Sequence, residues 1–197
     1  MAQLYYRYST MNAGKSTELI KVAHNYEERG KNVLCLIPEI ACDDGKPVIS
    51  SRIGISREAH IVSQRDNILT MFADLNAMKK IDCVLVDECQ FLTKQNVEQL
   101  AEIVDSFDVP VICYGLKNDF RNQLFEGAYH LLVFADKIEE IKTICWCGRK
   151  ATMVARISEG KIVRTGDQIG LDKGEYISLC RKHYNDGTIY EPKKLTV

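Results

Sequence analysis

Long apolar runs are missing from this sequence of 197 residues. A membrane-spanning helix needs a run of about 18 or more apolar residues, so we expect none. Residues 1–7 lack the basic segment and following apolar stretch of a secretory leader. We therefore expect a cytoplasmic protein that does not bind a membrane.

An excess of charge of either sign is missing as well. The 26 Lys and Arg residues balance 27 Asp and Glu residues, which gives a formal net charge of -1. This balance gives no general reason to expect nucleic acid or an anionic membrane as a partner, and we predict neither. The sequence also has no internal repeat and no low-complexity tract, while its 46% hydrophobic composition is sufficient for a folded core.

Short apolar runs alternate with amphipathic segments over the first 140 residues. The runs cover residues 4–8, 33–37, 83–86 and 109–114. Runs of this length that are rich in β-branched residues are typical of strands buried on both faces. Residues 15–28 have a helical pattern that stops before Gly30, and Thr93 is a capping residue ahead of a second such pattern. The alternation predicts an α/β domain over residues 1–140, with a parallel sheet flanked by helices.

The pattern changes near residue 141. Short strand-like segments at residues 152–157 and 162–164 surround a Gly-containing turn, and long helical patterns stop. The region has too few apolar residues for a core of its own, so we expect a bound metal to supply stability. We predict a small β-rich domain over residues 141–192 and a tail over residues 193–197.

A phosphate-binding loop is indicated directly after the first predicted strand. Its usual pattern is Gly, four residues, and then Gly-Lys-Ser or Gly-Lys-Thr at the start of a helix. The chain has Ser9 in the place of the first glycine, and the rest of the pattern holds. The predicted loop consists of Ser9, Thr10, Met11, Asn12, Ala13, Gly14, Lys15, Ser16 and Thr17. Such a loop turns backbone N–H groups and a helix N-terminus toward the phosphates of ATP.

Charged and hydroxyl side chains beside this loop suggest phosphoryl transfer. Lys15 is expected to bridge the β- and γ-phosphates, and the Ser16 hydroxyl to coordinate Mg²⁺. The third apolar run ends in two acids, of which Asp87 is predicted to hold Mg²⁺. Glu88, one residue further along, points elsewhere and is available for proton transfer. Arg52 is a candidate second cation for the charge on the transferred group.

Eight cysteines are many for a chain expected in a reducing compartment. Cys35, Cys83 and Cys113 lie in apolar runs, where we interpret them as small buried side chains. A separate group near the C-terminus supplies two close pairs of metal-ligating residues. Its members are Cys145, Cys147, Cys180 and His183. Four protein ligands arranged in two pairs are typical of a closed, structural zinc site.

Four motifs together resemble the zinc-containing thymidine kinase family. They are the phosphate loop, the segment Asp87-Glu88-Cys89-Gln90-Phe91, residues 114–120 with the sequence Tyr-Gly-Leu-Lys-Asn-Asp-Phe, and the Cys/His group. The resemblance extends over nearly the full chain. It implies a RecA-like P-loop sheet with a small zinc-ribbon-like domain that carries a lasso loop. It also implies transfer of the γ-phosphoryl group of ATP to the 5′-hydroxyl of thymidine or deoxyuridine, in nucleotide salvage.

The same resemblance implies roles for single residues. Glu88 matches the catalytic base, and Gln90 matches a residue that lines the active site, where we place it on the phosphate side. The implied walls of the thymine pocket are Met11, Phe91, Leu116, Phe120 and Val154. The implied lasso spans residues 166–176, and its expected contacts to the nucleoside are Ile169, Gly170, Gly174 and Tyr176. The Cys/His group matches the zinc ligands.

The resemblance further implies that Mg²⁺ accompanies ATP, that the chain forms a homotetramer, and that thymidine triphosphate inhibits it. Two other classes stay open from the residues alone. A P-loop ATPase would use the same loop to drive a change of shape. A zinc-ribbon module would bind nucleic acid through a basic stripe, of which the chain has a faint version weakened by Glu139 and Glu140. The basic residues concerned are Lys142, Arg149, Lys150 and Arg156.

Overall fold

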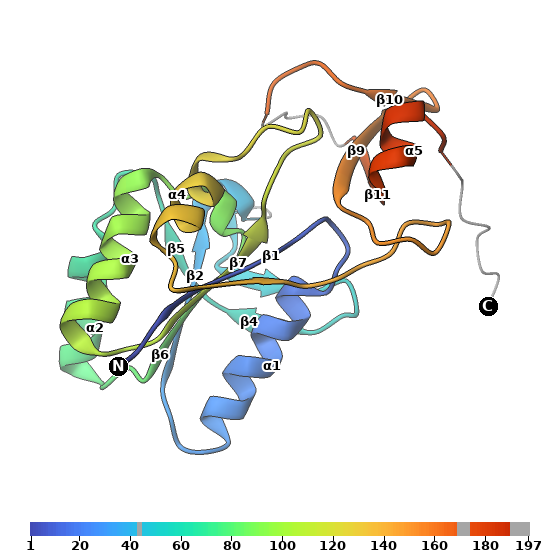
Figure 1. Ribbon diagram of the computed structural model, residues 1–197. Coiled ribbons are helices and arrows are strands. Elements are labelled where there is room, and N and C mark those ends of the chain that lie inside the picture. Colours follow the sequence, from blue (N-terminus) through green and yellow to red (C-terminus); the bar gives the residue numbers. More distant parts are fainter. Residues whose placement is uncertain (43–44, 169–173, 190–197) are drawn as a thin grey trace.

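The computed structural model of the chain describes residues 1–42, 45–168 and 174–189. Its larger part is a six-stranded sheet (Figure 1) in the order β5-β2-β6-β7-β1-β8. These strands are β1 (Leu4–Ser9), β2 (Val33–Pro38), β5 (His60–Val62), β6 (Cys83–Val86), β7 (Val111–Leu116) and β8 (Lys137–Glu140). Every neighbouring pair is parallel, which confirms the predicted α/β class.

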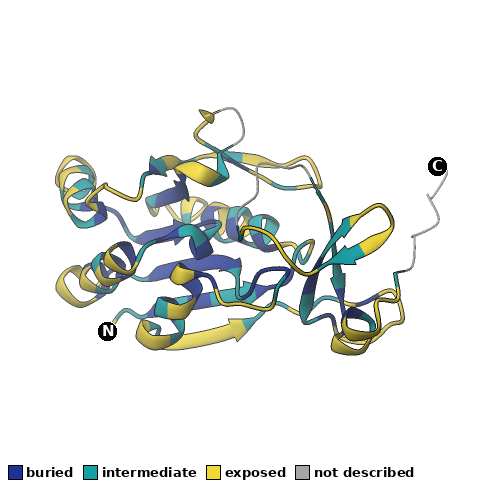
Figure 2. Ribbon diagram, turned by 90° about the horizontal axis from the view of Figure 1, so that it is seen from above, coloured by how far each residue is buried: buried dark blue, intermediate teal, exposed yellow. Residues whose placement is uncertain are grey.

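Helices cover both faces of this sheet. They are α1 (Lys15–Glu27), α2 (Ile68–Met78), α3 (Lys94–Phe107) and α4 (Glu126–Phe134). Helix α1 packs on one face, and the other three cover the opposite face (Figure 1). Side chains alternate along a strand, so Cys83 and Leu85 of β6 point to the core beneath α1. Val84 and Val86 point to the other core. The central strands are therefore buried between the helices (Figure 2), and the predicted burial of Cys35, Cys83 and Cys113 is confirmed.

Local signals set the helix ends. Thr93 caps α3: its hydroxyl accepts a hydrogen bond from the Asn96 backbone N–H at 3.2 Å. The Asn96 side chain accepts one from the Thr93 N–H at 3.1 Å, which completes a capping box. At the end of α1, the Gly30 N–H donates to the Glu27 carbonyl at 2.8 Å and closes the turn. Both predicted helix boundaries are confirmed.

A smaller antiparallel sheet follows the large one in sequence. It contains β9 (Met153–Ser158), β10 (Lys161–Val163) and β11 (Glu175–Leu179), in the order β10-β9-β11, and α5 (Arg181–Asp186) packs beside it. Its buried core is small and includes two of the cysteines in the Cys/His group. The remaining elements are the hairpin of β3 (Val48–Ser50) and β4 (Ser56–Glu58), and two short 3-10 turns, η1 (Glu39–Ala41) and η3 (Cys89–Phe91).

Two hydrogen bonds fasten the small sheet and α5 to the large domain. The Ser178 hydroxyl of β11 donates to the Met11 carbonyl in the phosphate loop at 2.6 Å. The buried Tyr184 hydroxyl of α5 donates to the Phe120 carbonyl, beyond β7, at 2.6 Å. Both bonds end on segments that surround the candidate site. Across the described ranges, the structure contains no helix with the length and hydropathy needed to cross a membrane.

Candidate active site

The phosphate loop connects β1 to α1 as predicted. Gly14 caps α1 with a φ of 79°, a left-handed conformation that glycine adopts without steric cost. Ser9 is the last residue of β1, and its hydroxyl donates to the Ile141 carbonyl at 2.5 Å. The position of the missing first glycine is therefore part of the extended strand, so a serine fits there without backbone strain.

Lys15 begins α1 and lies buried beneath the loop. Its ammonium donates to the Thr10 carbonyl at 2.9 Å. Burial lowers the pKa of Lys15 below its usual range, while the negative charges of Glu88 and Asp87 oppose this shift. A buried cation with a backbone partner inside the loop is well placed to exchange that partner for a phosphate oxygen.

Asp87 follows β6, and its carboxylate accepts a hydrogen bond from the Ser16 hydroxyl at 2.7 Å. Only 2% of Asp87 is exposed, and its second oxygen, Oδ1, has no hydrogen-bond partner among the described residues. Burial raises the pKa of this carboxyl to about 7, and the neighbouring Glu88 charge adds to the rise. A buried carboxylate oxygen without a partner, beside a serine hydroxyl, is a donor set that fits Mg²⁺.

Glu88 has a left-handed backbone, with φ of 49° and ψ of 36°, which is uncommon for a residue with a side chain. Its carboxylate accepts a hydrogen bond from the Gln90 amide nitrogen at 2.5 Å. The Gln90 oxygen in turn accepts the Leu116 backbone N–H at 2.9 Å. The buried Gln90 side chain thus ties the Glu88 carboxylate to the end of β7.

Two cavities meet at Glu88. One, of about 290 Å³, is lined by the phosphate loop and by the tip of the β3–β4 hairpin, including Arg52. The other, of about 210 Å³, is largely apolar. Met11, Glu88 and Leu116 line both cavities. A carboxylate at the junction of a cavity lined by the phosphate loop and an apolar cavity can accept a proton from a hydroxyl held between them.

The predicted phosphate-site residues come together in part. Asn12, Ala13, Gly14, Lys15, Ser16, Thr17 and Arg52 line the larger cavity with Met11. Ser9 and Thr10 are buried behind it. Asp87 lines an adjoining cavity that also contains Ser16 and Glu88. Arg52 is exposed, and its charge contributes to the lowered pKa of Lys15.

The predicted base-pocket residues also come together around one cavity. Phe91, Phe120, Val154 and Tyr176 line the apolar cavity with the three shared residues. Gln90, which we expected on the phosphate side, lines this apolar cavity and neither of the two cavities beside the phosphate loop. The rings of Phe120 and Tyr176 meet edge to face at 6.5 Å. Gly174 lies against Arg156 and does not line this cavity. Ile169 and Gly170 lie outside the described residues.

Sequence reasoning missed three residues that line the apolar cavity: Asp119, Phe125 and Gln168. Asp119 directly precedes Phe120 in the motif of residues 114–120, and this position was the sequence signal that could have indicated it. Gln168 is part of the predicted lasso but has no pattern around it that indicates contact with a distant loop.

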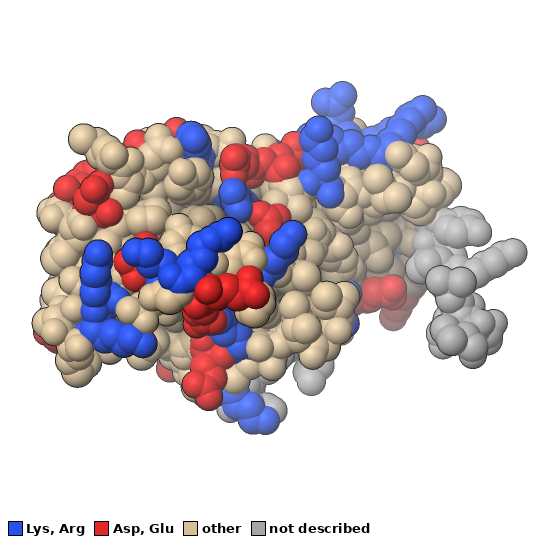
Figure 3. Space-filling view, turned by 90° about the horizontal axis from the view of Figure 1, so that it is seen from below, with Lys and Arg blue, Asp and Glu red and all other residues tan. Residues whose placement is uncertain are grey.

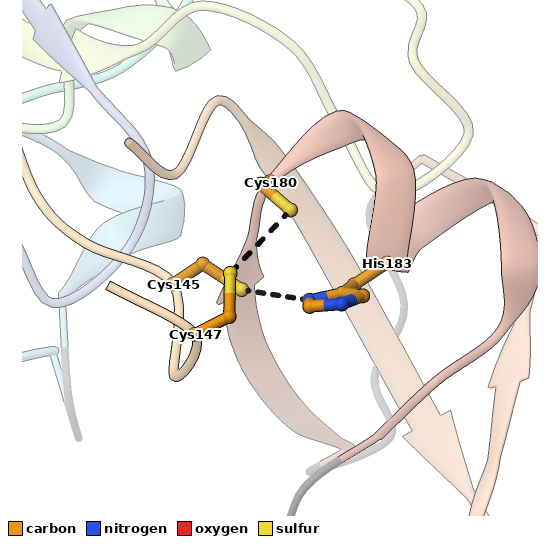
Figure 4. A group of neighbouring side chains, drawn as sticks. All are labelled: Cys145, Cys147, Cys180 and His183. Carbon is orange, nitrogen blue, oxygen red and sulfur yellow. Dashed lines mark hydrogen bonds between the residues drawn. The ribbon is translucent and has the colours of Figure 1, made fainter. Parts of the chain in front are cut away.

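The Cys/His group gathers at one end of the small domain (Figure 4). Its four ligand atoms all lie within 4.8 Å of one another. The Cys147 and Cys180 sulfurs are 4.0 Å apart, and Cys145 Sγ lies 3.4 Å from His183 Nδ1. Tetrahedral zinc with Zn–S bonds of about 2.3 Å separates two sulfur ligands by about 3.8 Å, so the group fits this metal.

A tight turn explains how two cysteines separated by one residue both reach this centre. The Gly148 N–H donates to the Cys145 carbonyl at 2.8 Å, and Gly148 has a φ of 81° that favours glycine. The ring of Trp146, between the cysteines, stacks on His183 with centroids 4.2 Å apart. The turn and the stacking hold the first ligand pair against the second.

The raised pKa of Asp87 predicts an effect on stability. An unfolded aspartate ionises near pH 4, whereas the folded one ionises near pH 7, so unfolding releases a proton between these values. The stability contribution of Asp87 is therefore present below pH 4 and is lost as the pH rises to 7. We expect Asp87→Asn to raise the free energy of unfolding of the ligand-free protein at pH 8 by on the order of a few kcal/mol. Its melting temperature should rise accordingly.

The gain should be smaller at pH 5, and scanning calorimetry at both values tests it. Asp105→Asn, at an exposed position of α3, serves as the matched control. A ligand-free Asp87→Asn variant that melts below the unmodified protein at pH 8 contradicts the assigned burial cost.

Known proteins resemble this chain over nearly its whole length. A family model described as thymidine kinase matches residues 2–184. A thymidine kinase of Streptococcus pyogenes is 57% identical over 186 residues, which cover 93% of this chain and 97% of that protein. A thymidine kinase of Shewanella oneidensis is 50% identical over 188 residues, covering 94% and 98%.

Among solved structures, the Legionella pneumophila ATPase DotB has a TM-score of 0.41 and 12% identity, over 76% of this chain and 43% of that one. That similarity is too distant to bear on function, whereas the family model and the relatives agree with the site described above. The chain belongs to the thymidine kinase family.

Proposed function

We propose that this thymidine kinase transfers the γ-phosphoryl group of Mg²⁺-bound ATP to the 5′-hydroxyl of thymidine or deoxyuridine, with Glu88 as the catalytic base. One observation carries the proposal: Glu88 lines both the phosphate cavity and the apolar cavity. A base must lie within hydrogen-bond reach of the hydroxyl that it deprotonates. A nucleoside with its base in the apolar cavity places its 5′-hydroxyl toward this junction.

On the phosphate side, loop N–H groups and the N-terminus of α1 bind the triphosphate. Lys15 exchanges the Thr10 carbonyl for phosphate oxygens, and Arg52 contributes a second positive charge from the β3–β4 hairpin. These fixed cations stabilise the charge that spreads over the transferred group. Arg52 is exposed at the hairpin tip, so its interaction with the phosphates depends on the position of the hairpin when nucleotide is bound.

Asp87 and Ser16 would hold Mg²⁺. Ser16 and Asp87 line the cavity next to Glu88, and the carboxylate that accepts the Ser16 hydroxyl has a second oxygen without a partner among the described residues. A magnesium ion held there would supply positive charge against the phosphates of ATP. Lys15 lies close to both acids, so this corner combines a buried cation with a buried carboxylate.

On the nucleoside side, aromatic and aliphatic walls fit a flat pyrimidine. Phe91 and Phe120 supply ring faces and edges, while Met11, Leu116 and Val154 fill the remaining wall. Gln90 acts between the two cavities. Its amide hydrogen-bonds the Glu88 carboxylate and the Leu116 backbone N–H, so it holds the catalytic base Glu88 where the cavities meet.

The Cys/His group would bind a structural zinc ion through Cys145, Cys147, Cys180 and His183, with no position left open for chemistry. We assign residues 1–140 to the nucleotide-binding domain and residues from 141 onward to the zinc-binding domain, since β8 ends at Glu140. The predicted boundary at residues 192 and 193 lies outside the described part of the chain. Hydrogen bonds from Ser178 and Tyr184 connect the zinc domain to Met11 in the phosphate loop and to Phe120 in the base pocket.

We also propose a homotetramer and inhibition by thymidine triphosphate. Strand β8 is at the edge of the large sheet, and Tyr129, Val133 and Ile138 expose apolar surface on or near it. Such a surface is suited to contact between copies of the chain. Because the two cavities adjoin, one molecule that carries both thymine and a triphosphate can occupy them together. Location in the cytoplasm stays a prediction.

The alternative of a nucleic-acid-binding ribbon loses support from the charges. Lys150 pairs with Glu140, and Arg156 lies over the Phe120 ring at 5.6 Å. In Figure 3 basic and acidic side chains are interspersed over the α/β domain, while basic side chains predominate at the end that carries the small domain. An ATPase without a small-molecule acceptor has no use for an apolar cavity beside its proton acceptor, so we favour the kinase.

Zinc binding is tested by metal analysis and by the fluorescence of Trp146, the one tryptophan in the chain. We expect one zinc per chain, and a change in emission when a chelator removes it, because Trp146 stacks on His183. Cys147→Ser should lower zinc content, while Cys42→Ser, outside the group, should retain it. Protein prepared without chelator that contains no zinc rules the site out.

Glu88→Gln tests the catalytic base. The variant keeps the side-chain size and both cavities, so we expect ATP and thymidine to bind normally while kcat falls about 100-fold or more. Assays that follow ADP across a panel of nucleosides should show turnover with thymidine and deoxyuridine and little with purine nucleosides. Near-normal kcat in Glu88→Gln removes the assigned role, and ADP release that needs no nucleoside favours the ATPase alternative.

A further inference from the structure

Asp119 lies in the loop between β7 and α4 and is 2% exposed. Its carboxylate accepts four hydrogen bonds. One oxygen takes the backbone N–H groups of Arg121 and Gln123 at 2.8 and 2.9 Å. The other takes Arg121 Nε at 2.9 Å and the Gln168 amide nitrogen at 3.2 Å. A buried carboxylate is costly unless it is paired and hydrogen-bonded, and here both conditions are met.

These bonds join two distant parts of the chain. Gln168 follows β10, and its amide nitrogen also donates to the Leu124 carbonyl at 3.3 Å. Arg121 reaches across in the same direction and donates to the Gly166 carbonyl at 2.8 Å. Three hydrogen bonds therefore connect the loop after β7 to residues 166–168, and Asp119 orients both side chains that make them.

The orientation of the Gln168 amide follows from its partners. The Asp119 carboxylate and the Leu124 carbonyl can only accept hydrogen bonds. The amide nitrogen must face them, and the reverse orientation would set the amide oxygen against two acceptors. The orientation of the Gln168 amide thus depends on the acceptor oxygens of Asp119 and Leu124 and not on packing alone.

Asp119, Phe120 and Gln168 all line the apolar cavity that we assign to the base. The hydrogen bonds of the Asp119 carboxylate end on Arg121, Gln123 and Gln168, and none of them reaches Glu88 or the phosphate loop. Asp119 therefore acts on one wall of the pocket without a hydrogen bond to the proposed catalytic base.

We propose that Asp119 is a positioning residue for nucleoside binding: it fastens residues 166–168 to the loop that carries Phe120, and so sets the wall of the base pocket. This inference rests on the proposed pocket. It assigns a functional role to Asp119, Arg121 and Gln168 that differs from general stabilisation of the fold, because it acts on thymidine and not on ATP.

The test compares kinetic constants for the two substrates. In Asp119→Asn, an amide N–H₂ group faces the donors Arg121 Nε and Gln168, so the cross-connection is lost. We expect the KM for thymidine to rise about tenfold, the effect of ~1.4 kcal/mol, while kcat and the KM for ATP stay within about twofold. Thymidine binding measured by calorimetry without ATP should weaken by the same factor.

Gln168→Ala removes the connection from the half-buried partner and keeps the test available if Asp119→Asn fails to fold. We expect the same direction of change, and a double variant no worse than Asp119→Asn alone. Gln123→Ala is the matched control, because Gln123 is exposed and contributes to this cluster through its backbone N–H. It should keep the thymidine KM unchanged.

Phe91→Ala separates failure of this inference from failure of the pocket itself. If Phe91→Ala raises the thymidine KM while Asp119→Asn and Gln168→Ala leave it within twofold, the positioning role is wrong and the pocket stands. If none of the three changes it, the pocket assignment is wrong as well. Equal increases in the KM for thymidine and for ATP would show a structural role for Asp119 and overturn the proposal.

Discussion

The hydrogen bond from Ser16 to Asp87 is the contact on which the rest of the site depends. It joins the segments that leave β1 and β6, two strands separated in the sheet by β7. Because all these strands are parallel, their carboxyl ends lie at the same edge of the sheet. The hydrogen bond connects two of these ends next to Lys15. Glu88 follows Asp87 directly, so the same contact that organises the phosphate side also fixes where a proton can be accepted.

The small domain holds two segments of the large domain that surround the site. Ser178 holds the Met11 carbonyl, and Tyr184, next to the candidate zinc ligand His183, holds the Phe120 carbonyl. Met11 and Phe120 both line the apolar cavity, Met11 from the phosphate loop and Phe120 from the loop after β7. A domain with little core of its own therefore contributes through two hydrogen bonds and a cluster of metal-ligating residues.

Local patterns in the sequence predicted the four central strands of the large sheet, the two helix boundaries and the Cys/His group, because each depends on neighbouring residues. The edge strands β5 and β8 were not predicted, since they are short and lack a buried apolar run. The predicted run at residues 109–114 begins too early: Pro110 cannot donate to the sheet, and β7 starts at Val111. The contact between Asp119 and Gln168 could not be found this way, since it joins positions far apart in the chain. The roles assigned to site residues rest on motif positions together with the cavities that the structure forms.

The most direct measurement is a crystal structure with thymidine, Mg²⁺ and a non-hydrolysable ATP analogue. The account predicts the 5′-oxygen within about 2.6–3.2 Å of the Glu88 carboxylate, with the thymine between Phe91 and Phe120. It also predicts the γ-phosphate on the Lys15 side of Glu88. A nucleoside bound outside the apolar cavity, or a 5′-oxygen that faces away from Glu88, would contradict the account.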